Sequence, residues 1–130
     1  MIGTNNPGNL RSSKGFKWQG EVGDNKGYCV FDTMNNGVRA LAKNLLTYQR
    51  RYGLRTVKDI ITRWAPPNEN NTDSYIAYVS QKMCVGPEDI IDLNDLDTLE
   101  DLVNAIIWHE NGVSVDASVV DFGIKAAMLS

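Results

Sequence analysis

The stretch from Thr98 to Gly112, TLEDLVNAIIWHENG, constrains the fold most, because it carries a complete helix with its start and stop signals. Thr98 can cap the N-terminus, with Asp101 three residues later as a capping-box partner. Asn111 and Gly112 supply the left-handed residue on which helices commonly stop. The apolar residues recur at helical spacing and form one stripe, made of Leu99, Leu102, Val103 and Ile106.

Glu110 continues this stripe one turn beyond Ile106. A carboxylate at that position points at or near the core, beside the negative end of the helix dipole. Both features disfavour the charged form, which is the environment that a general acid working near neutral pH requires. The alternative is a solvated residue at a frayed helix end, and this stretch alone favours neither interpretation.

The remaining chain predicts an α+β domain that is mainly α, with a small N-terminal β-hairpin. Residues 3 to 9, GTNNPGN, form a turn-rich opening. Two short strands are predicted at 16–20 and 28–31, joined by the turn residues 23–27. Helices are then predicted over 36–52, from Thr56 to the Pro66-Pro67 stop, over 71–83, over 98–110, and from Asp116 or Ser118 to Ala127, with one short turn of helix at Pro87.

The length of 130 residues fits one domain, residues 1–130, with a core that needs no disulfide. No apolar run has the length of a membrane span, so no membrane partner is expected. The N-terminus lacks the plan of a signal peptide, which predicts synthesis in the cytoplasm. Cys29 and Cys84 are therefore expected to be reduced and buried, although a disulfide stays open.

Charge is sorted along the chain, although the net charge is only −3. Eleven of the thirteen basic residues lie between Arg11 and Arg63. Such sorting commonly reflects solvated surface, and the more specific interpretation is a basic flank that faces an anionic polymer. Nucleic acid is not expected as a partner, because the basic residues form no dense cluster with interleaved aromatics.

No metal or cofactor is expected. His109 is the only histidine, and HENGV lacks the second histidine of a zinc-protease motif. A Cys-His nucleophilic pair would require His109, and nothing nearby in the sequence supports one.

Several short segments resemble the lysozyme superfamily. NNPGNLR, KWQG, GYCVFDTMNNGVRALAKNLLTY and RWAPPNENNTDSYIAYV resemble small phage proteins described as lysozyme-like or as virion structural proteins. Their order is also similar to the glucosaminidase and lytic transglycosylase branch. There, an Asn-Asn segment precedes a hairpin, an aromatic-Asp segment opens a long helix, and a Tyr follows on a later helix. The matching pieces here are 5–9, the hairpin with Glu21, 31–33, and 71–75.

The position of one motif along the chain differs from that superfamily. Its catalytic Glu ends a helix upstream of the Asn-Asn segment, whereas only four residues precede Asn5 here. AIIWHENG, residues 105–112, resembles the missing helix at the other end of the chain. The resemblance therefore implies a circularly permuted lysozyme-like domain with Glu110 in the catalytic position, and neighbouring termini make such a permutation physically easy.

The resemblance implies roles for several residues, each with a structural alternative. Glu110 would protonate the glycosidic oxygen as general acid. If a second carboxylate is needed, Glu21 and then Asp24 on the hairpin are the candidates, and for Asp24 a plain turn role is favoured. A single-carboxylate transglycosylase mechanism needs neither, because a hydroxyl of the sugar attacks to give an anhydro product.

Substrate contacts are expected from Tyr75 and from Asn5, Asn6 and Asn9. Tyr75 could instead be a core tyrosine, and a turn role is favoured for at least one of the three asparagines. Trp18 and Trp64 could stack on sugar rings or lie in the core, and Trp108 is expected to lie in the core.

The resemblance thus implies a phage or prophage enzyme that cleaves peptidoglycan glycan strands as a muramidase, a glucosaminidase or a lytic transglycosylase. It would act at the cell wall as an endolysin after lysis-linked release, or from the virion, with other virion proteins as potential partners. The alternative is a non-catalytic virion structural or wall-binding protein that keeps the fold. A cytoplasmic protein that interferes with a host factor would leave no readable motif.

Overall fold

The computed structural model describes residues 1–130 as an α+β structure that is mainly α. A 3₁₀ turn, η1 (Ile2–Thr4), precedes a two-stranded antiparallel sheet of β1 (Glu21–Asn25) and β2 (Tyr28–Phe31). The helices are α1 (Met34–Tyr52), α2 (Val57–Trp64), α3 (Thr72–Met83), α4 (Leu96–Asn111) and α5 (Ala117–Leu129). The predicted fold class and the N-terminal hairpin are therefore confirmed.

Local capping sets most helix boundaries. Side-chain oxygens of Thr33, Thr56, Asn71 and Asp116 accept hydrogen bonds from backbone N–H groups at the starts of α1, α2, α3 and α5. Gly53 and Gly112 end α1 and α4 in the left-handed conformation. The predicted ends of these two helices and the predicted starts of α2 and α3 are confirmed.

The start of α4 differs from the prediction. Asp95 is the N-cap and accepts the hydrogen bond from Thr98 N at 3.1 Å. Thr98 instead occupies the third helical position, and its hydroxyl also donates to Asp95 at 2.7 Å. The predicted turn of helix at Pro87 is absent, because residues 86–95 form turns and one isolated bridge between Thr56 and Ile90.

The first strand also lies later than predicted. Lys26 and Gly27 both have positive φ, 54° and 91°, and form a two-residue hairpin turn. This short turn pairs Asn25 directly with Tyr28 and Asp24 with Cys29, so most of the predicted turn belongs to β1. Residues 16–20 are no strand, because Gly20 turns the chain at φ 80° and only Phe16 forms an isolated bridge.

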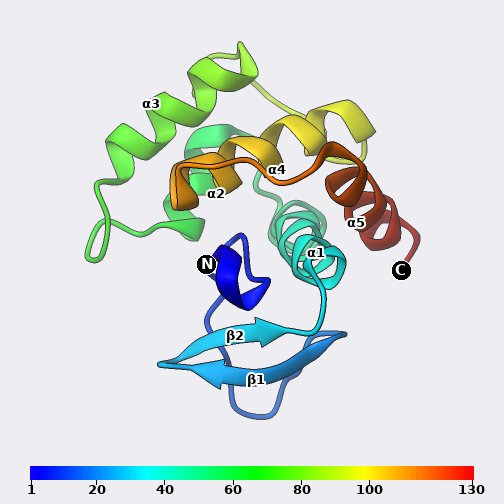
Figure 1. Ribbon diagram of the computed structural model, residues 1–130. Helices are drawn as coiled ribbons and strands as arrows, with labels where there is room; N and C mark the ends of the chain where they lie inside the picture. Colours follow the sequence, from blue (N-terminus) through cyan, green and yellow to red (C-terminus); the bar gives the residue numbers. More distant parts are fainter.

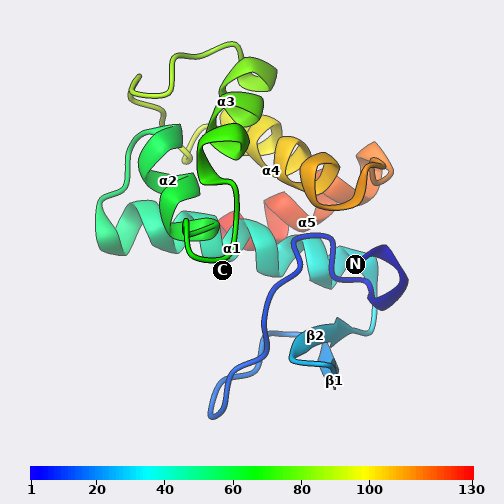
Figure 2. The ribbon, with the colours of Figure 1, turned by 90° about the vertical axis from the view of Figure 1, so that its left-hand side faces the viewer.

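The helices share one large core, and the hairpin lies outside it. The main core cluster comprises 24 buried residues contributed by the helices and the loops between them. A smaller cluster of Leu10, Cys29, Phe31 and Ala40 joins the hairpin to α1. Figures 1 and 2 show the hairpin on one side of the helices, with the N-terminal segment running between the two.

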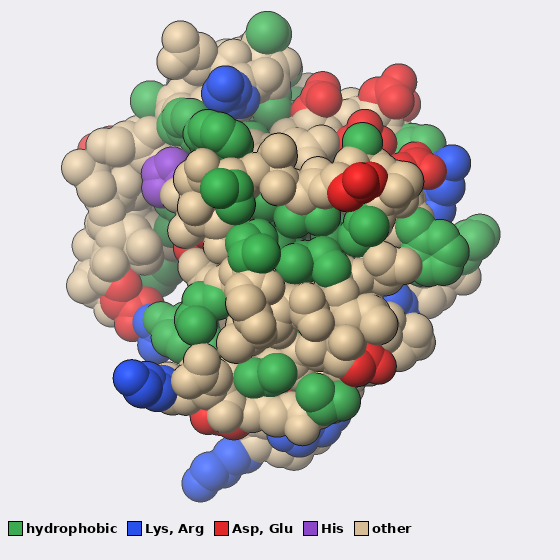
Figure 3. All heavy atoms as spheres, viewed as in Figure 1, with side chains coloured by type: hydrophobic (Ala, Val, Ile, Leu, Met, Phe, Trp, Pro, Cys, Tyr) green, Lys and Arg blue, Asp and Glu red, His purple; other side chains and the backbone are tan.

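No helix has both the length and the apolar character needed to cross a membrane. On the face shown in Figure 3, hydrophobic side chains gather over the middle of the molecule, whereas Lys and Arg side chains lie mainly near its edge. Trp108 is itself an exposed apolar residue, because 46% of it is accessible to solvent. The expectation that Trp108 lies in the core is therefore wrong.

Candidate functional site

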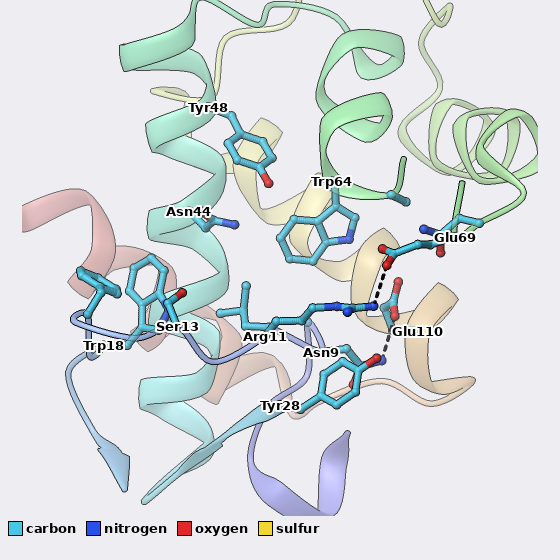
Figure 4. Close-up of a pocket in the computed structure, with 15 residues that line it drawn as sticks. Asn9, Arg11, Ser13, Trp18, Tyr28, Asn44, Tyr48, Trp64, Glu69 and Glu110 are labelled. Carbon is cyan, nitrogen blue, oxygen red and sulfur yellow. Dashed lines mark hydrogen bonds and ion pairs between the residues drawn. The ribbon is translucent and has the colours of Figure 1, made fainter. Parts of the chain in front are cut away.

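A cleft of about 410 Å³ opens between the N-terminal segment and the helices. Its walls come from residues 8–18 of the N-terminal segment, Tyr28 of β2, Asn44 and Tyr48 of α1, Trp64 at the end of α2, and residues 65–70 of the loop that follows. Glu110, near the end of α4, completes the lining. Figure 4 shows these side chains converging from both sides.

Each oxygen of the Glu110 carboxylate is held by a different element. Asn9 donates its side-chain amide to Oε1 at 2.8 Å, and the Tyr75 hydroxyl donates to Oε2 at 2.7 Å. Glu110 is partly buried, so it is neither fully solvated nor inside the core. The structure therefore brings together three of the predicted site residues, which come from opposite ends and the middle of the chain.

Tyr75 is oriented by its surroundings on α3. Trp64 Nε1 donates to the Tyr75 hydroxyl at 3.2 Å, which leaves the hydroxyl proton for Glu110. The ring is buried and stacks on His109, with centroids 3.6 Å apart. Burial, and then the negative charge of Glu110, raise the pKa of Tyr75 well above its ordinary value. The Tyr75 hydroxyl consequently keeps its proton and donates a hydrogen bond to the Glu110 carboxylate.

The end of α4 also holds the N-terminal segment in place. The Asn111 side chain donates to the Pro7 carbonyl at 2.8 Å and to the Ile107 carbonyl of its own helix at 2.9 Å. Asn9 then takes the left-handed conformation, φ 51°, that asparagine tolerates better than most residues. These contacts fix the amide of Asn9 opposite Glu110.

An amino group lies near the carboxylate. The Met1 amino group donates to Oδ1 of Asn9 and to the Asn6 carbonyl. Burial lowers the pKa of this amino group, and the negative charge of Glu110 opposes that shift. Asn9 therefore links the Met1 amino group on one side to the Glu110 carboxylate on the other.

Asn5 and Asn6 do not line the cleft, because their amides are used by the backbone. Asn6 is fully buried and donates to the carbonyls of Leu10 and Cys29, both at 3.0 Å, while it accepts from Leu10 N at 2.9 Å. Asn5 donates to the Phe31 carbonyl at 3.1 Å. Both residues attach the N-terminal segment to β2 rather than contact the cleft.

The hairpin carboxylates are not brought to the cleft either. The Glu21 side chain is 1% exposed and accepts from Trp18 N at 3.0 Å and from Lys17 at 3.5 Å. Asp24 is exposed on the hairpin and accepts from the Ser12 hydroxyl and from Gly27 N. These hydrogen bonds, that of Ser12 first, lower the pKa of Asp24. Both carboxylates stabilise turns, so neither faces Glu110 as a second catalytic group.

Two of the three tryptophans line the cleft. Trp18 packs edge-on against Phe16, with ring centroids 4.9 Å apart, and Trp64 lies across from them beside Asn44 and Tyr48. Both rings also pack against the smaller core cluster, so each combines a structural role with an accessible surface.

Sequence reasoning missed a charged pair in the cleft. Arg11 and Glu69 form an ion pair at 3.3 Å, and the Arg11 guanidinium lies 5.5 Å from the centre of the Tyr28 ring. Arg11 belongs to the NNPGNLR segment that the sequence singled out, whereas Glu69 lies in a polar loop without any distinguishing pattern. The spacing of residues along the sequence does not predict a contact between two loops, so this pair could not be found from the sequence.

The fold and the cleft define a mainly helical α+β domain whose central feature is a partly buried glutamate held by a tyrosine and an asparagine. No family model matches the sequence. The chain is 38% identical over 112 residues to Protein P5 of Pseudoalteromonas phage PM2, an alignment that covers 83% of this chain and 68% of the relative. The chain therefore belongs to the same family as Protein P5, and this phage relative supports a phage origin.

Proposed function

We propose that this protein is a peptidoglycan-cleaving glycosidase of phage origin, with Glu110 as its general acid. The observation that carries the proposal is the placement of Glu110 in the wall of a cleft, with Tyr75 and Asn9 each donating to one carboxylate oxygen. A proton donor in a cleft wall, opposite accessible aromatic rings, is what cleavage of a glycan strand requires.

The two donors favour the ionised form of Glu110, which differs from the charge-disfavouring environment that the sequence predicted, and they therefore act on the product of proton transfer. When Glu110 gives its proton to the leaving glycosidic oxygen, a carboxylate remains. The Tyr75 hydroxyl and the Asn9 amide already point at its two oxygens, so the new charge is stabilised without rearrangement. Hydrogen bonds to an ionised acceptor are stronger than neutral ones, so this stabilisation lowers the barrier.

The uncharged polar and aromatic groups of the cleft suit the neutral parts of an amino sugar. Asn44, Asn70 and Ser13 offer amide and hydroxyl groups, and Trp18, Trp64 and Tyr48 offer aromatic faces. Amides pair with acetamido groups and hydroxyls, and aromatic faces pack against the C–H faces of pyranose rings. Polar groups at a few points among apolar walls are the usual composition of a ligand site.

The position of the carboxylates supports a mechanism that uses Glu110 alone. Neither Glu21 nor Asp24 lines the cleft, and the only other carboxylate that does, Glu69, is paired with Arg11. In the single-carboxylate route, Glu110 protonates the leaving oxygen and then, as a base, accepts a proton from the attacking hydroxyl of the sugar. The glycosidic bond breaks and an intramolecular C–O bond forms, which gives an anhydro sugar end.

The circular permutation remains part of the proposal. Its support is that Glu110 lies beside Asn9 of the Asn-Asn segment although 101 residues separate them in sequence. A helix that ends in Glu before the Asn-Asn segment in the superfamily is thus matched by α4, which follows that segment in this chain.

Muropeptide release from purified sacculi tests the proposal. We expect the wild type to release soluble fragments and Glu110→Gln to lose at least a hundred-fold of the rate, because glutamine keeps the size of the side chain and one acceptor oxygen but carries no transferable proton. Asp101→Asn is the matched control, since Asp101 is exposed on the same helix and lies outside the cleft. Mass spectrometry of the fragments distinguishes anhydro ends from hydrolysed ends.

Two outcomes would contradict the proposal. Equal release by the wild type and Glu110→Gln would exclude Glu110 as the acid. Absence of release by the wild type from walls of several chemotypes, together with sedimentation of the protein with those walls, would favour the non-catalytic wall-binding alternative.

A further inference from the structure

We propose that Arg11 binds a carboxylate carried by the glycan, and that Glu69 occupies the place of this carboxylate in the free protein. This inference rests on the proposed function and narrows its substrate class to acidic amino-sugar strands. Such a strand carries carboxylates on a lactyl substituent or on a peptide attached to it.

Arg11 is the only Lys or Arg side chain that lines the cleft. The remaining polar groups of the cleft are amides, hydroxyls and the two carboxylates Glu69 and Glu110. Amides and hydroxyls bind neutral sugar groups, and the two carboxylates repel a negatively charged group of a ligand. Recognition of a negative charge in this cleft therefore depends on Arg11.

The Arg11 side chain is presented by a firmly held backbone. Arg11 forms an isolated antiparallel bridge with Tyr28, and Ser12 N donates to the Gly27 carbonyl at 2.9 Å. The guanidinium lies 5.5 Å from the centre of the Tyr28 ring, a distance at which a cation and an aromatic face attract each other. The side chain is nevertheless 63% exposed, so several of its five N–H groups face solvent.

Glu69 comes from the opposite wall and is easily displaced. It lies in the loop between α2 and α3, it is 45% exposed, and a single distance of 3.3 Å joins its Oε1 to Arg11. Figure 4 shows this pair reaching across the cleft near Glu110. An ion pair with this exposure contributes little to stability, so a ligand carboxylate can take its place at small cost.

Binding of two tetrasaccharides that differ only in charge tests the inference. One alternates N-acetylglucosamine with N-acetylmuramic acid and keeps its lactyl carboxylates free, and the other has these carboxylates converted to methylamides. All proteins carry Glu110→Gln to prevent turnover, and calorimetry at low salt gives the affinities. We expect the E110Q protein to bind the acidic form at least ten-fold more tightly than the amidated one.

Two additional substitutions should move this preference in opposite directions. Arg11→Gln should remove it by weakening the acidic form about ten-fold, because a charge-assisted contact is lost, while binding of the amidated form stays within two-fold. Glu69→Gln should strengthen binding of the acidic form roughly two- to five-fold, because the competing carboxylate is gone. Lys58→Gln and Glu88→Gln are matched controls from an exposed ion pair outside the cleft, and neither should change the preference.

The outcomes separate this inference from the proposed function. Equal binding of both tetrasaccharides, unchanged by Arg11→Gln, would overturn the role of Arg11 and leave the glycosidase proposal standing. Failure of both tetrasaccharides to bind any variant would instead contradict the saccharide site itself, and the role of Arg11 with it. A weaker acidic interaction in Glu69→Gln would assign Glu69 to binding rather than to competition.

Discussion

The Tyr75 hydroxyl lies 2.7 Å from Oε2 of Glu110, although the two residues belong to different helices and are 35 positions apart. The Trp64 indole donates a hydrogen bond to the same hydroxyl oxygen, so the Tyr75 hydroxyl proton is free to be donated to Glu110. This relationship makes Tyr75 the residue whose loss should affect Glu110 most directly without changing any charge.

Tyr75→Phe should reduce muropeptide release roughly ten- to hundred-fold, because a hydrogen bond to a charged group contributes about 1.5–3 kcal/mol. The ring and its stacking on His109 remain. Tyr78→Phe is the control, since the Tyr78 hydroxyl has no hydrogen-bond partner and its removal should leave the rate unchanged. Equal rates for both variants would show that the Tyr75 hydroxyl does not assist Glu110.

Gly37→Ala should destabilise the protein by about 1–3 kcal/mol, the usual range for overpacking. A Cβ at Gly37 would lie 1.8 Å from the Asn5 carbonyl oxygen, so α1 and the N-terminal segment would have to separate. Without this clash, alanine would be favoured in a helix by up to about 1 kcal/mol, so the sign of the change is informative. Urea unfolding measures it, with Gly3→Ala as a control that meets nothing within 4 Å.

Muropeptide release should also fall in Gly37→Ala, because the displaced segment carries Asn9. A variant with the stability and the activity of the wild type would contradict the close approach of Gly37 and Asn5.

The two cysteines should differ strongly in reactivity. Cys29 is fully buried, and burial, followed by the charge of Glu21, raises the pKa of its thiol to about 11. Cys84 is exposed, which corrects the expectation that both thiols are buried. Because the thiolate is the reactive form, a thiol reagent at pH 8 should label one equivalent in the folded protein and two in urea. Cys84→Ser should abolish the fast labelling, and two fast equivalents in the folded wild type would contradict the structure.

Lowering the pH should reduce the stability of the protein through the Asp95 cap at the start of α4. Hydrogen bonds from the Thr98 hydroxyl and from Thr98 N lower the pKa of Asp95 below its ordinary 3.8. A lowered pKa in the folded state contributes stability that is complete above about pH 3.8 and is lost as the pH falls through the folded-state pKa. Asp95→Asn should therefore melt below the wild type at pH 6 and converge with it near pH 2.

Thermal melts between pH 6 and pH 2 measure this difference, with Asp101→Asn as a control outside the cap. A gap between wild type and Asp95→Asn that stays constant across the range would contradict the role of the Asp95 charge.

Local signals predicted most of the helical structure correctly. Thr56, Asn71, Gly53 and Gly112 act on neighbouring backbone groups, so their effect can be read without knowing the fold. The first strand was misplaced because Gly23, Asp24 and Asn25 are turn formers that the two-residue turn at Lys26 and Gly27 leaves inside β1.

Trp108 shows how residue type can mislead. The stripe that ends at Ile106 places Trp108 about 200° around the helix, on the opposite face. The periodicity thus indicated an exposed side chain, but the size and apolar character of tryptophan favoured the core. The structure follows the periodicity.

The candidate site was predictable only in part. Helical spacing singled out Glu110, and the family resemblance added Tyr75 and Asn9, whose contacts with Glu110 no single-sequence pattern reports. Asn6 was a candidate for either substrate contact or a turn role, because an asparagine in a turn has the same sequence signature in both, and its three hydrogen bonds in the structure are internal. The pairing of Arg11 with Glu69 depends on how two loops face each other, which no local pattern encodes.

The separation of Asn9 and Glu110 by 101 residues has a consequence for biosynthesis. The ribosome makes the wall with Asn9 first and adds Glu110 only after α1, α2 and α3 have been made. A nascent chain or a fragment that ends before α4 contains the cleft aromatics but lacks the acid. Translation that is interrupted before α4 would therefore leave products without the proposed wall-cleaving chemistry.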